Sequence, residues 1–138
     1  MEYNGKKALV CGMARSGIAA AKLLNRLGAR VTLQDMKKRE EISADVLALE
    51  GEGIVLYTGA NPDEIACAQD LIVLSPGIPC DLPFIAAAEE AGIEVISEVE
   101  LAYRLTPCPI TAITGTNGKT TTTTLTGEIM KTAYSGTA

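Results

Sequence analysis

The sequence contains no histidine and no tryptophan, and it has only one phenylalanine. Without histidine, the chain offers no imidazole base and no imidazole metal ligand. With so few aromatic rings, it also lacks the stacking surfaces on which single-stranded nucleic acids bind. Aspartate and glutamate number 17 against 12 lysines and arginines, a net charge of −5. Because nucleic-acid-binding surfaces are basic, we expect no nucleic-acid partner.

The chain also has no closely spaced cysteines and no long apolar run. Its four cysteines form no CxxC pair, so no zinc site or redox motif is predicted; they are Cys11, Cys67, Cys80 and Cys108. No apolar run approaches the roughly 20 residues that a membrane span requires. The first ten residues carry no signal-peptide pattern. We therefore expect a cytoplasmic protein with reduced thiols and no membrane partner.

What the sequence does contain is a regular alternation of short apolar runs and amphipathic stretches. Strands are expected at residues 8–11, 31–35, 54–57, 70–74, 93–96 and 110–114. Helices are expected at residues 18–28, 44–51, 61–68, 82–91 and 98–105, and again after residue 118. This alternation predicts an α/β fold with a Rossmann-like parallel sheet and helices on both faces.

A change in composition near residue 110 indicates a domain boundary. Residues 111–138 hold 11 of the chain's 14 threonines, and the preceding TPCP segment, 106–109, is typical of a linker. We expect a first domain at residues 1–107 and the start of a second at residues 108–138. Because one strand and one helix cannot bury their own apolar faces, the chain is expected to be a fragment of a longer protein.

The segment GMARSG, residues 12–17, follows a predicted strand and opens a predicted helix. This is the position of the dinucleotide-binding fingerprint, although Ala14 replaces its second glycine. The free amides at the start of the helix suit an anion, and Arg15 and Ser16 add further donors. The segment predicts a nucleotide site and leaves open whether the ligand is NAD or another nucleotide.

Two other strand ends are expected to meet this segment. Asp35 ends the second strand about 20 residues on, where a carboxylate contacts the ribose or base of a nucleotide. Lys37 follows at the rim of the same pocket. The segment SPGIP begins at Ser75, after the fourth strand, and its Gly77 permits close approach of a ligand. In an open parallel sheet, ligands bind beyond these carboxyl ends.

The remaining charged residues are assigned to solvated surfaces. These include the run at positions 38–40 and the pair Glu89 and Glu90. Glu98 and Glu100 lie inside a predicted helix, which favours an exposed or linker-facing position over a catalytic one.

The segment GTNGKT, residues 115–120, is a shortened relative of the Walker A phosphate loop. Ile113 stands where the strict motif has its first glycine. The small residues expose backbone N–H groups to phosphate oxygens, Lys119 is expected to reach the β- and γ-phosphates, and the Thr120 hydroxyl can bind Mg²⁺. The segment therefore predicts a phosphate-binding loop.

Taken in order, GMARSG, Asp35, LIVLSPGIP, GIEVISEVEL and PITAITGTNGKTTT resemble the Mur ligases of bacterial peptidoglycan synthesis. The resemblance covers essentially all 138 residues as the N-terminal part of such an enzyme. It implies that residues 1–107 bind the UDP part of a substrate and that residues 108–138 begin an ATP-binding domain. The spacing favours the branch that joins D-glutamate to UDP-N-acetylmuramoyl-L-alanine, using ATP and Mg²⁺. The full-length enzyme is expected to be a cytoplasmic monomer.

The resemblance also implies residue roles. The pyrophosphate would contact Arg15, Ser16 and Gly17. The uracil would contact Asp35, with Lys37 beside it, while Ser75 and Gly77 would flank the nucleotide. Lys119 would be catalytic and Thr120 would bind the metal. The ATP loop would consist of Gly115, Thr116, Asn117, Gly118, Lys119, Thr120 and Thr121. The other metal ligands and the amino-acid site would lie beyond residue 138, so the fragment is expected to be inactive alone.

Three alternatives remain open from the sequence. The first is a fragment of a nicotinamide-dependent dehydrogenase, which GMARSG and Asp35 would fit but the threonine-rich loop would not. The second is a non-catalytic nucleotide-binding module. The third is a Mur ligase that adds a different amino acid.

Overall fold

The computed structural model describes residues 2–134 of the chain. It divides into two compact units, Met1–Leu105 and Thr106–Ala138, which are described separately below. Among residues 2–134, none of the helices combines the length and the apolar character needed to cross a membrane.

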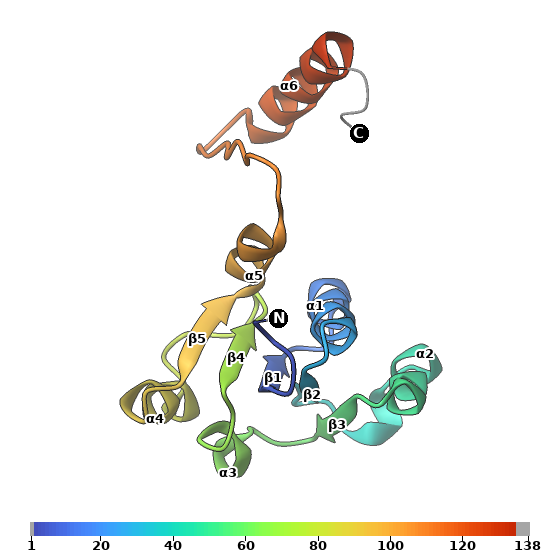
Figure 1. The fold of residues 1–138 in the computed structure, drawn as a ribbon, viewed down its shortest axis with the longest axis vertical. Helices are drawn as coiled ribbons and strands as arrows, with labels where there is room; N and C mark the ends of the chain where they lie inside the picture. The colour runs from blue at the N-terminus through green and yellow to red at the C-terminus, as the bar shows by residue number, and fades with distance from the viewer. Residues whose placement is uncertain (1, 135–138) are drawn as a thin grey trace. The chain divides into compact units, whose positions relative to one another are not determined.

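The first unit alternates strands with helices along its whole length (Figure 1). Its strands are β1 (Lys7–Cys11), β2 (Arg30–Asp35), β3 (Val55–Thr58), β4 (Leu71–Leu74) and β5 (Glu94–Ser97). Its α-helices are α1 (Arg15–Arg26), α2 (Ala44–Leu47), α3 (Asp63–Ala66), α4 (Pro83–Glu90) and α5 (Glu98–Leu105). Two short 3₁₀ helices, η1 (Arg39–Glu41) and η2 (Ala48–Glu52), flank α2.

The five strands form one parallel sheet in the order β3-β2-β1-β4-β5. The predicted Rossmann-like parallel sheet is therefore confirmed. Strand order reverses between the central strand β1 and its neighbour β4. Cys11 lies in register with both Gln34 of β2 and Leu74 of β4, so these three strands end side by side. Ligands of open parallel sheets bind in the crevice at such a reversal.

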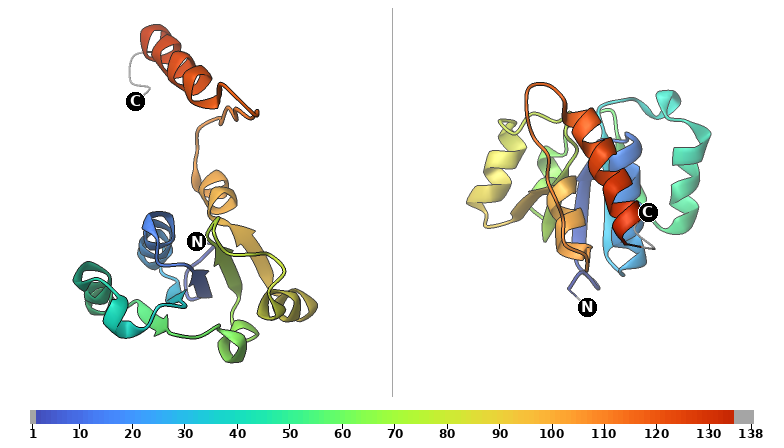
Figure 2. Two further views of the ribbon diagram at one scale, coloured as in Figure 1. Left: turned by 180° about the vertical axis from the view of Figure 1, so that it is seen from behind. Right: turned by 90° about the horizontal axis from the view of Figure 1, so that it is seen from above.

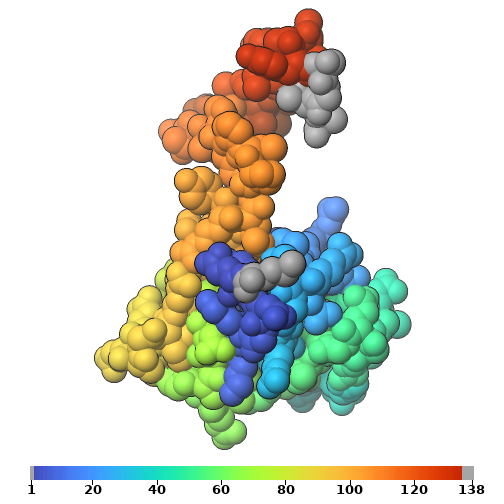
Figure 3. Space-filling model, in the orientation of Figure 1, coloured from blue at the N-terminus to red at the C-terminus, as the bar shows by residue number. Residues whose placement is uncertain are grey.

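Successive side chains of the central strands point to opposite faces of the sheet and pack into two separate cores. In β1, Ala8 and Val10 pack into a cluster that includes Leu24 of α1 and Leu101 of α5. On the other face, Leu9 and Cys11 join a cluster formed with residues of α3 and α4: Ala66, Phe84, Ile85 and Ala88. Helices therefore cover both faces of the sheet (Figure 2). The space-filling view shows the surface that these elements of the first unit form together (Figure 3).

Most expected elements of the first unit form, with shifted ends. The helix expected at 61–68 is only the four-residue α3, and the one expected at 44–51 divides into α2 and η2. Ser43 occupies the N-cap position of α2 but makes no side-chain capping bond. Gly28 follows α1 with a φ of +87°, a conformation that glycine adopts without strain, as expected of a helix stop.

The second unit contains one helix, α6 (Lys119–Ala133), preceded by an extended segment. The prediction of a strand at residues 110–114 is wrong, because these residues form no strand in the structure. A strand requires a neighbour for its backbone N–H and C=O groups, and none of the described residues of this unit supplies one. Nor does α6 bury any residue among those described, and Leu125 and Ile129 are 61% and 58% exposed.

Candidate nucleotide-binding site

The carboxyl edge of the sheet brings together three segments that the sequence singled out. Residues 12–17 follow β1, Asp35 ends β2, and Ser75 follows β4. Backbone bonds lock the edge: the Gly12 N–H donates to the Gln34 carbonyl at 2.7 Å, and the Ser75 N–H donates to the Cys11 carbonyl at 3.1 Å. The predicted convergence of these segments is therefore present within one rigid sheet.

The first and third glycines of GMARSG occupy crowded positions. Gly12 has a φ of +104°, and a Cβ placed there would lie 2.7 Å from the Ser75 Oγ. A Cβ on Gly17 would lie only 2.0 Å from the Gly12 carbonyl oxygen. Any side chain at either position would therefore displace its neighbours. Ala14, at the missing second glycine, is an exposed N-cap residue with a φ of −82°.

The first turn of α1 presents free backbone donors. Its N-cap, Ala14, has no side-chain capping bond, so nothing from that residue satisfies the N–H groups of Arg15, Ser16 and Gly17. The side chains of Arg15 and Ser16 are exposed. Within residues 2–134, the Arg15 guanidinium forms no ion pair. Three amides, a helix dipole and a free guanidinium together suit a phosphate group.

Asp35 joins the loops after β1 and β2. Its Oδ2 accepts the Met13 N–H at 2.8 Å, and its Oδ1 accepts the Lys37 N–H at 3.0 Å. Each oxygen retains a further lone pair for a ligand donor. The half-buried carboxylate therefore has a structural task beside the binding task predicted for it. The Lys37 side chain is exposed.

A pocket of about 430 Å³ opens beside this carboxylate. Asp35 and Gly77, both predicted to contact the nucleotide, line it together with Gln34 and Asn61. Its other lining residues are apolar: Met36, Ile78, Pro79, Leu82 and Phe84. A pocket with apolar walls and a few polar groups at one end is suited to a planar heterocycle. Arg15, Ser16, Lys37 and Ser75 do not line it.

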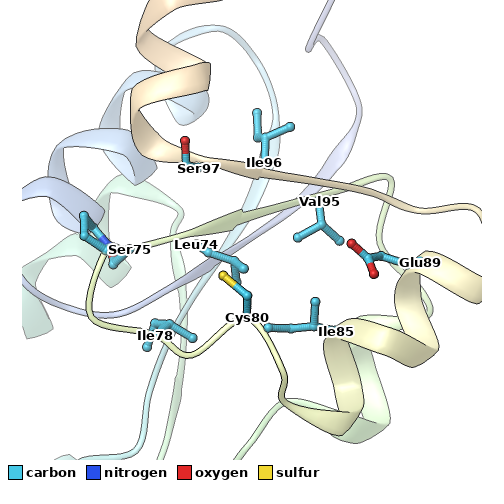
Figure 4. Close-up of a pocket in the computed structure, with 10 residues that line it drawn as sticks. Leu74, Ser75, Ile78, Cys80, Ile85, Glu89, Val95, Ile96 and Ser97 are labelled. Carbon is cyan, nitrogen blue, oxygen red and sulfur yellow. The ribbon is translucent and has the colours of Figure 1, made fainter. Parts of the chain in front are cut away.

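A second pocket of about 250 Å³ lies between β4, β5 and α4 (Figure 4). Ser75 stands at one end of this pocket and Glu89 at the other. Between them the side chains are mostly apolar, with the thiol of Cys80 among them. Residues of the SPGIP loop thus line both pockets, and Ile78 is common to the two.

The sequence analysis did not predict the hydrogen bonds of two polar residues at this edge. Gln34 is 3% exposed and donates through Nε2 to the Ala60 carbonyl at 2.8 Å. Glu98, expected on an exposed or linker-facing surface, is half-buried and accepts a hydrogen bond from the Ser75 hydroxyl at 2.5 Å. The two partners lie 23 positions apart, so only the adjacency of β4 and β5 could have indicated their contact.

The predicted phosphate loop of the second unit is closed by a hydrogen bond from its own lysine. Gly118 has a φ of +75° and forms the N-cap of α6 without a side-chain bond, leaving the first-turn amides free. The Lys119 ammonium donates to the Gly115 carbonyl across the loop. The strand–loop–helix arrangement is incomplete because the strand is missing, but the loop and the helix start are both formed.

The threonines of α6 fall into two groups. Thr123 and Thr124 donate their hydroxyl hydrogens to the carbonyls of Lys119 and Thr120, at 2.8 and 2.9 Å. No such bond engages the hydroxyls of Thr120 or Thr121 among the described residues. The two hydroxyls nearest the loop therefore remain available to a ligand, and an oxygen at Thr120 suits Mg²⁺.

Elsewhere the described residues offer little further chemistry. Residues 2–134 hold no cluster of three or more cysteine, aspartate or glutamate side chains suited to a metal. Cys11 is fully buried, and burial raises the pKa of its thiol to about 12. A thiol that stays protonated is neither a nucleophile nor a metal ligand.

Comparison with known proteins identifies the relatives of this chain. Residues 6–97 match the family model described as Mur ligase MurD-like, N-terminal domain. The UDP-N-acetylmuramoylalanine–D-glutamate ligase of Alkaliphilus metalliredigens is 47% identical over 133 residues, covering 95% of this chain and 29% of that protein. The enzyme of the same name from Enterococcus hirae is 50% identical over 126 residues, covering 91% of this chain and 27% of the relative.

The fold of this chain is also similar to that of a solved structure. A murein peptide ligase from Psychrobacter arcticus superposes with a TM-score of 0.64 at 24% identity, covering 94% of this chain and 27% of that one. The chain spans about three tenths of the length of the curated relatives it matches. Because the family model covers residues 6–97, about two thirds of the sequence, the chain belongs to the MurD-like branch of the Mur ligases and carries their N-terminal domain.

Proposed function

We propose that this chain supplies the UDP-binding domain and the ATP phosphate loop of a ligase that joins D-glutamate to UDP-N-acetylmuramoyl-L-alanine. Relatives sharing 44–50% of its residues carry the name UDP-N-acetylmuramoylalanine–D-glutamate ligase. The observation that carries the proposal is the pocket where Asp35 and Gly77 meet, beside the free first turn of α1. The enzyme would act in the cytoplasm as part of peptidoglycan precursor synthesis.

The UDP group fits this edge of the sheet in two parts. The apolar walls of the 430 Å³ pocket suit the uracil ring, and Asp35 can accept its N3–H. The amides of Arg15, Ser16 and Gly17 then suit the pyrophosphate at the start of α1. Ala14 is compatible with this ligand because it does not need to press a phosphate against a second glycine. Lys37 and Arg15 would add charge at the rim.

The loop of the second unit fits a nucleoside triphosphate. Its first-turn amides and the Lys119 ammonium suit phosphate oxygens, and the free Thr120 hydroxyl suits Mg²⁺. Gly115, Thr116, Asn117 and Thr121 would complete the phosphate contacts. ATP would phosphorylate the L-alanyl carboxylate to an acyl phosphate and leave as ADP. The D-glutamate amine would then attack the acyl carbon, form the amide and displace phosphate. The role of Lys119 would be to release its bond to the Gly115 carbonyl and neutralise phosphate charge.

Isothermal titration calorimetry with UDP-N-acetylmuramoyl-L-alanine, ATP and NADH tests this assignment on the chain itself. Replacing Gly77 by valine is the sharpest variant, because a Cβ at Gly77 meets no atom within 4 Å. The added side chain should therefore enter the pocket without straining the fold. We expect it to weaken the UDP ligand by about tenfold or more, equivalent to about 1.4 kcal/mol.

Two matched variants complete the design. Gly51→Val places the same side chain at another uncrowded glycine, away from the pocket, and should leave binding unchanged. Asp35→Ala should cost the UDP ligand about 1–3 kcal/mol while leaving ATP binding unchanged, and Lys119→Ala should do the reverse. Tighter binding of NADH than of the UDP ligand, or equal binding to Gly77→Val and the unaltered chain, would contradict the uridine pocket.

A further inference from the structure

The hydrogen bond between Ser75 and Glu98 links the end of β4 to the start of α5. Ser75 is 6% exposed, and its hydroxyl donates to the Glu98 Oε1 at 2.5 Å. Glu98 is the first residue of α5, directly after β5. A bond between a hydroxyl and a carboxylate is stronger than one between neutral groups. The side-chain orientation of Ser75 is therefore fixed by a charged partner.

Ser75 in turn supports the glycine loop. Its Oγ lies 2.7 Å from the position of a Cβ on Gly12 and 2.9 Å from that of a Cβ on Gly17. The same oxygen therefore fills the space between the first and third glycines, at the point where β1 turns into α1. Because Ser75 donates its only hydrogen to Glu98, it faces the loop as a filler and an acceptor.

Glu98 is itself held firmly. The Glu100 N–H donates to the Ser97 Oγ at 3.1 Å, which fixes the first turn of α5. One turn along, Leu101 is 1% exposed and belongs to the same core as Leu24 of α1. The carboxylate therefore projects from a helix that packs directly against α1. Because the helix is fixed by its packing, a single side chain projecting from it can hold the loop in one position.

We infer that Glu98 is a positioning residue for the phosphate-binding loop and that it acts through Ser75. By fixing the Ser75 hydroxyl against Gly12 and Gly17, it sets the direction of the free amides at the start of α1. This role makes Ser75 a support for the loop and not a hydrogen donor to the ligand. The inference rests on the proposed UDP site for its functional consequence, but the loop geometry exists without a ligand.

A second effect of Glu98 has the opposite sign. Glu98 and Ser16 line one small pocket of about 240 Å³, so the carboxylate lies close to the start of α1. Its negative charge repels an anion bound at that helix start. Glutamine at this position removes the charge and retains an oxygen that accepts the Ser75 hydrogen. Methionine removes both the charge and the acceptor while keeping the side-chain length.

The test measures UDP binding by calorimetry and the amide resonances of Gly12 and Gly17 by NMR. We expect Glu98→Met and Ser75→Ala each to weaken UDP by about tenfold, as for loss of a hydrogen bond to a charged group. The double variant should bind no worse than either single one, because both remove the same link. Glu98→Gln should bind at least as well as the unaltered chain. Glu100→Met, which removes a carboxylate from the same helical turn, is the matched control.

The amide resonances distinguish this inference from the proposed function. They should move in ligand-free Glu98→Met and Ser75→Ala and stay in place in Glu100→Met, with the thermal midpoint compared in each case. Failure of the unaltered chain to bind UDP would contradict the proposed function and leave the amide measurement to decide the role of Glu98. Unmoved Gly12 and Gly17 amides, or additive losses of UDP affinity, would overturn the positioning role.

Discussion

The segment Lys7–Cys11 and the segment 110–114 are both short and largely apolar, and each leads through a glycine-containing loop into a helix. The first is a strand between β2 and β4, with four of its five residues buried. The second forms no strand, and its residues are exposed or half-exposed. The comparison shows that an apolar run becomes a strand only where neighbours accept its backbone bonds and cover its side chains.

The helices that follow show the same contrast. Helix α1 buries Gly17, Ala20, Ala21 and Leu24 against the sheet. Helix α6 is longer, yet none of its described residues is buried. An isolated helix of about 15 residues is marginal in water, because its stability comes mainly from packing. The two loops at the starts of these helices, both predicted to bind phosphate, therefore differ in how much packing supports them.

Hydrogen exchange should show the largest difference between the two units. We expect the amides of Leu9 and Val10 to exchange only through global unfolding, at a cost of about 5 kcal/mol or more. The amides of α6 should exchange close to the rate of an unstructured chain. Exchange measured by NMR on the monomer decides this, and equal protection of α6 and β1 would remove the contrast between the units.

Truncation of one leucine in each helix gives the next largest effect. Leu24 is 0% exposed, so Leu24→Ala should lower the free energy of unfolding by about 2–5 kcal/mol. Leu125 is 61% exposed, so Leu125→Ala should change it by less than about 0.5 kcal/mol. Urea titration of the cooperative transition measures both. A similar loss in Leu125→Ala would show that α6 packs on something in solution.

Replacing one glycine by alanine should destabilise the first unit when the glycine lies in α1, but should stabilise the helix when it lies in α6. Gly17→Ala places a Cβ 2.0 Å from the Gly12 carbonyl oxygen and should cost about 1–3 kcal/mol. Gly127→Ala meets no atom within 4 Å and should favour α6 by about 1 kcal/mol. Thermal unfolding reports the first change, and helical circular dichroism reports the second. A neutral Gly17→Ala would mean that the loop can shift away from the helix start.

The last comparison concerns the pH dependence of stability at two cysteines, Cys11 and Cys108. Burial raises the pKa of the Cys11 thiol from 9.0 to about 12, so above pH 9 the unfolded chain loses this proton before the folded one. Stability should therefore fall between pH 9 and pH 12, by about 1.4 kcal/mol per pH unit from this group. Cys11→Ala should flatten that slope, whereas Cys108→Ala, at an exposed thiol, should not. An identical slope in both variants would assign the pH dependence to other groups.

Much of the first unit was predictable because its signals are local. The apolar run at residues 8–11, the glycines at 12 and 17, and the acid at 35 each fix a strand or a turn through neighbouring residues. A parallel sheet then places the strand ends together by geometry alone, which is why the convergence of Asp35 with the SPGIP loop could be foreseen.

The features that the sequence did not reveal depend on contacts between distant residues. The missing strand at 110–114 depends on a neighbour, which no residue within the segment can indicate. Likewise, Glu98 has the helical context of a surface residue, and its bond to Ser75 arises only because β5 adds beside β4. Gln34 is a polar residue within a strand, and the Ala60 carbonyl that satisfies its buried amide comes from a residue 26 positions away.

The carboxylate of Asp35 already bonds the loops after β1 and β2 before any ligand arrives. A ligand entering the pocket would therefore find its walls in place and would restrict little additional conformational freedom. Its association rate should then be set by diffusion and by attraction to Arg15 and Lys37, without a slow closing step. The site would therefore be preformed, and its selectivity would come from a shape that is set when the chain folds.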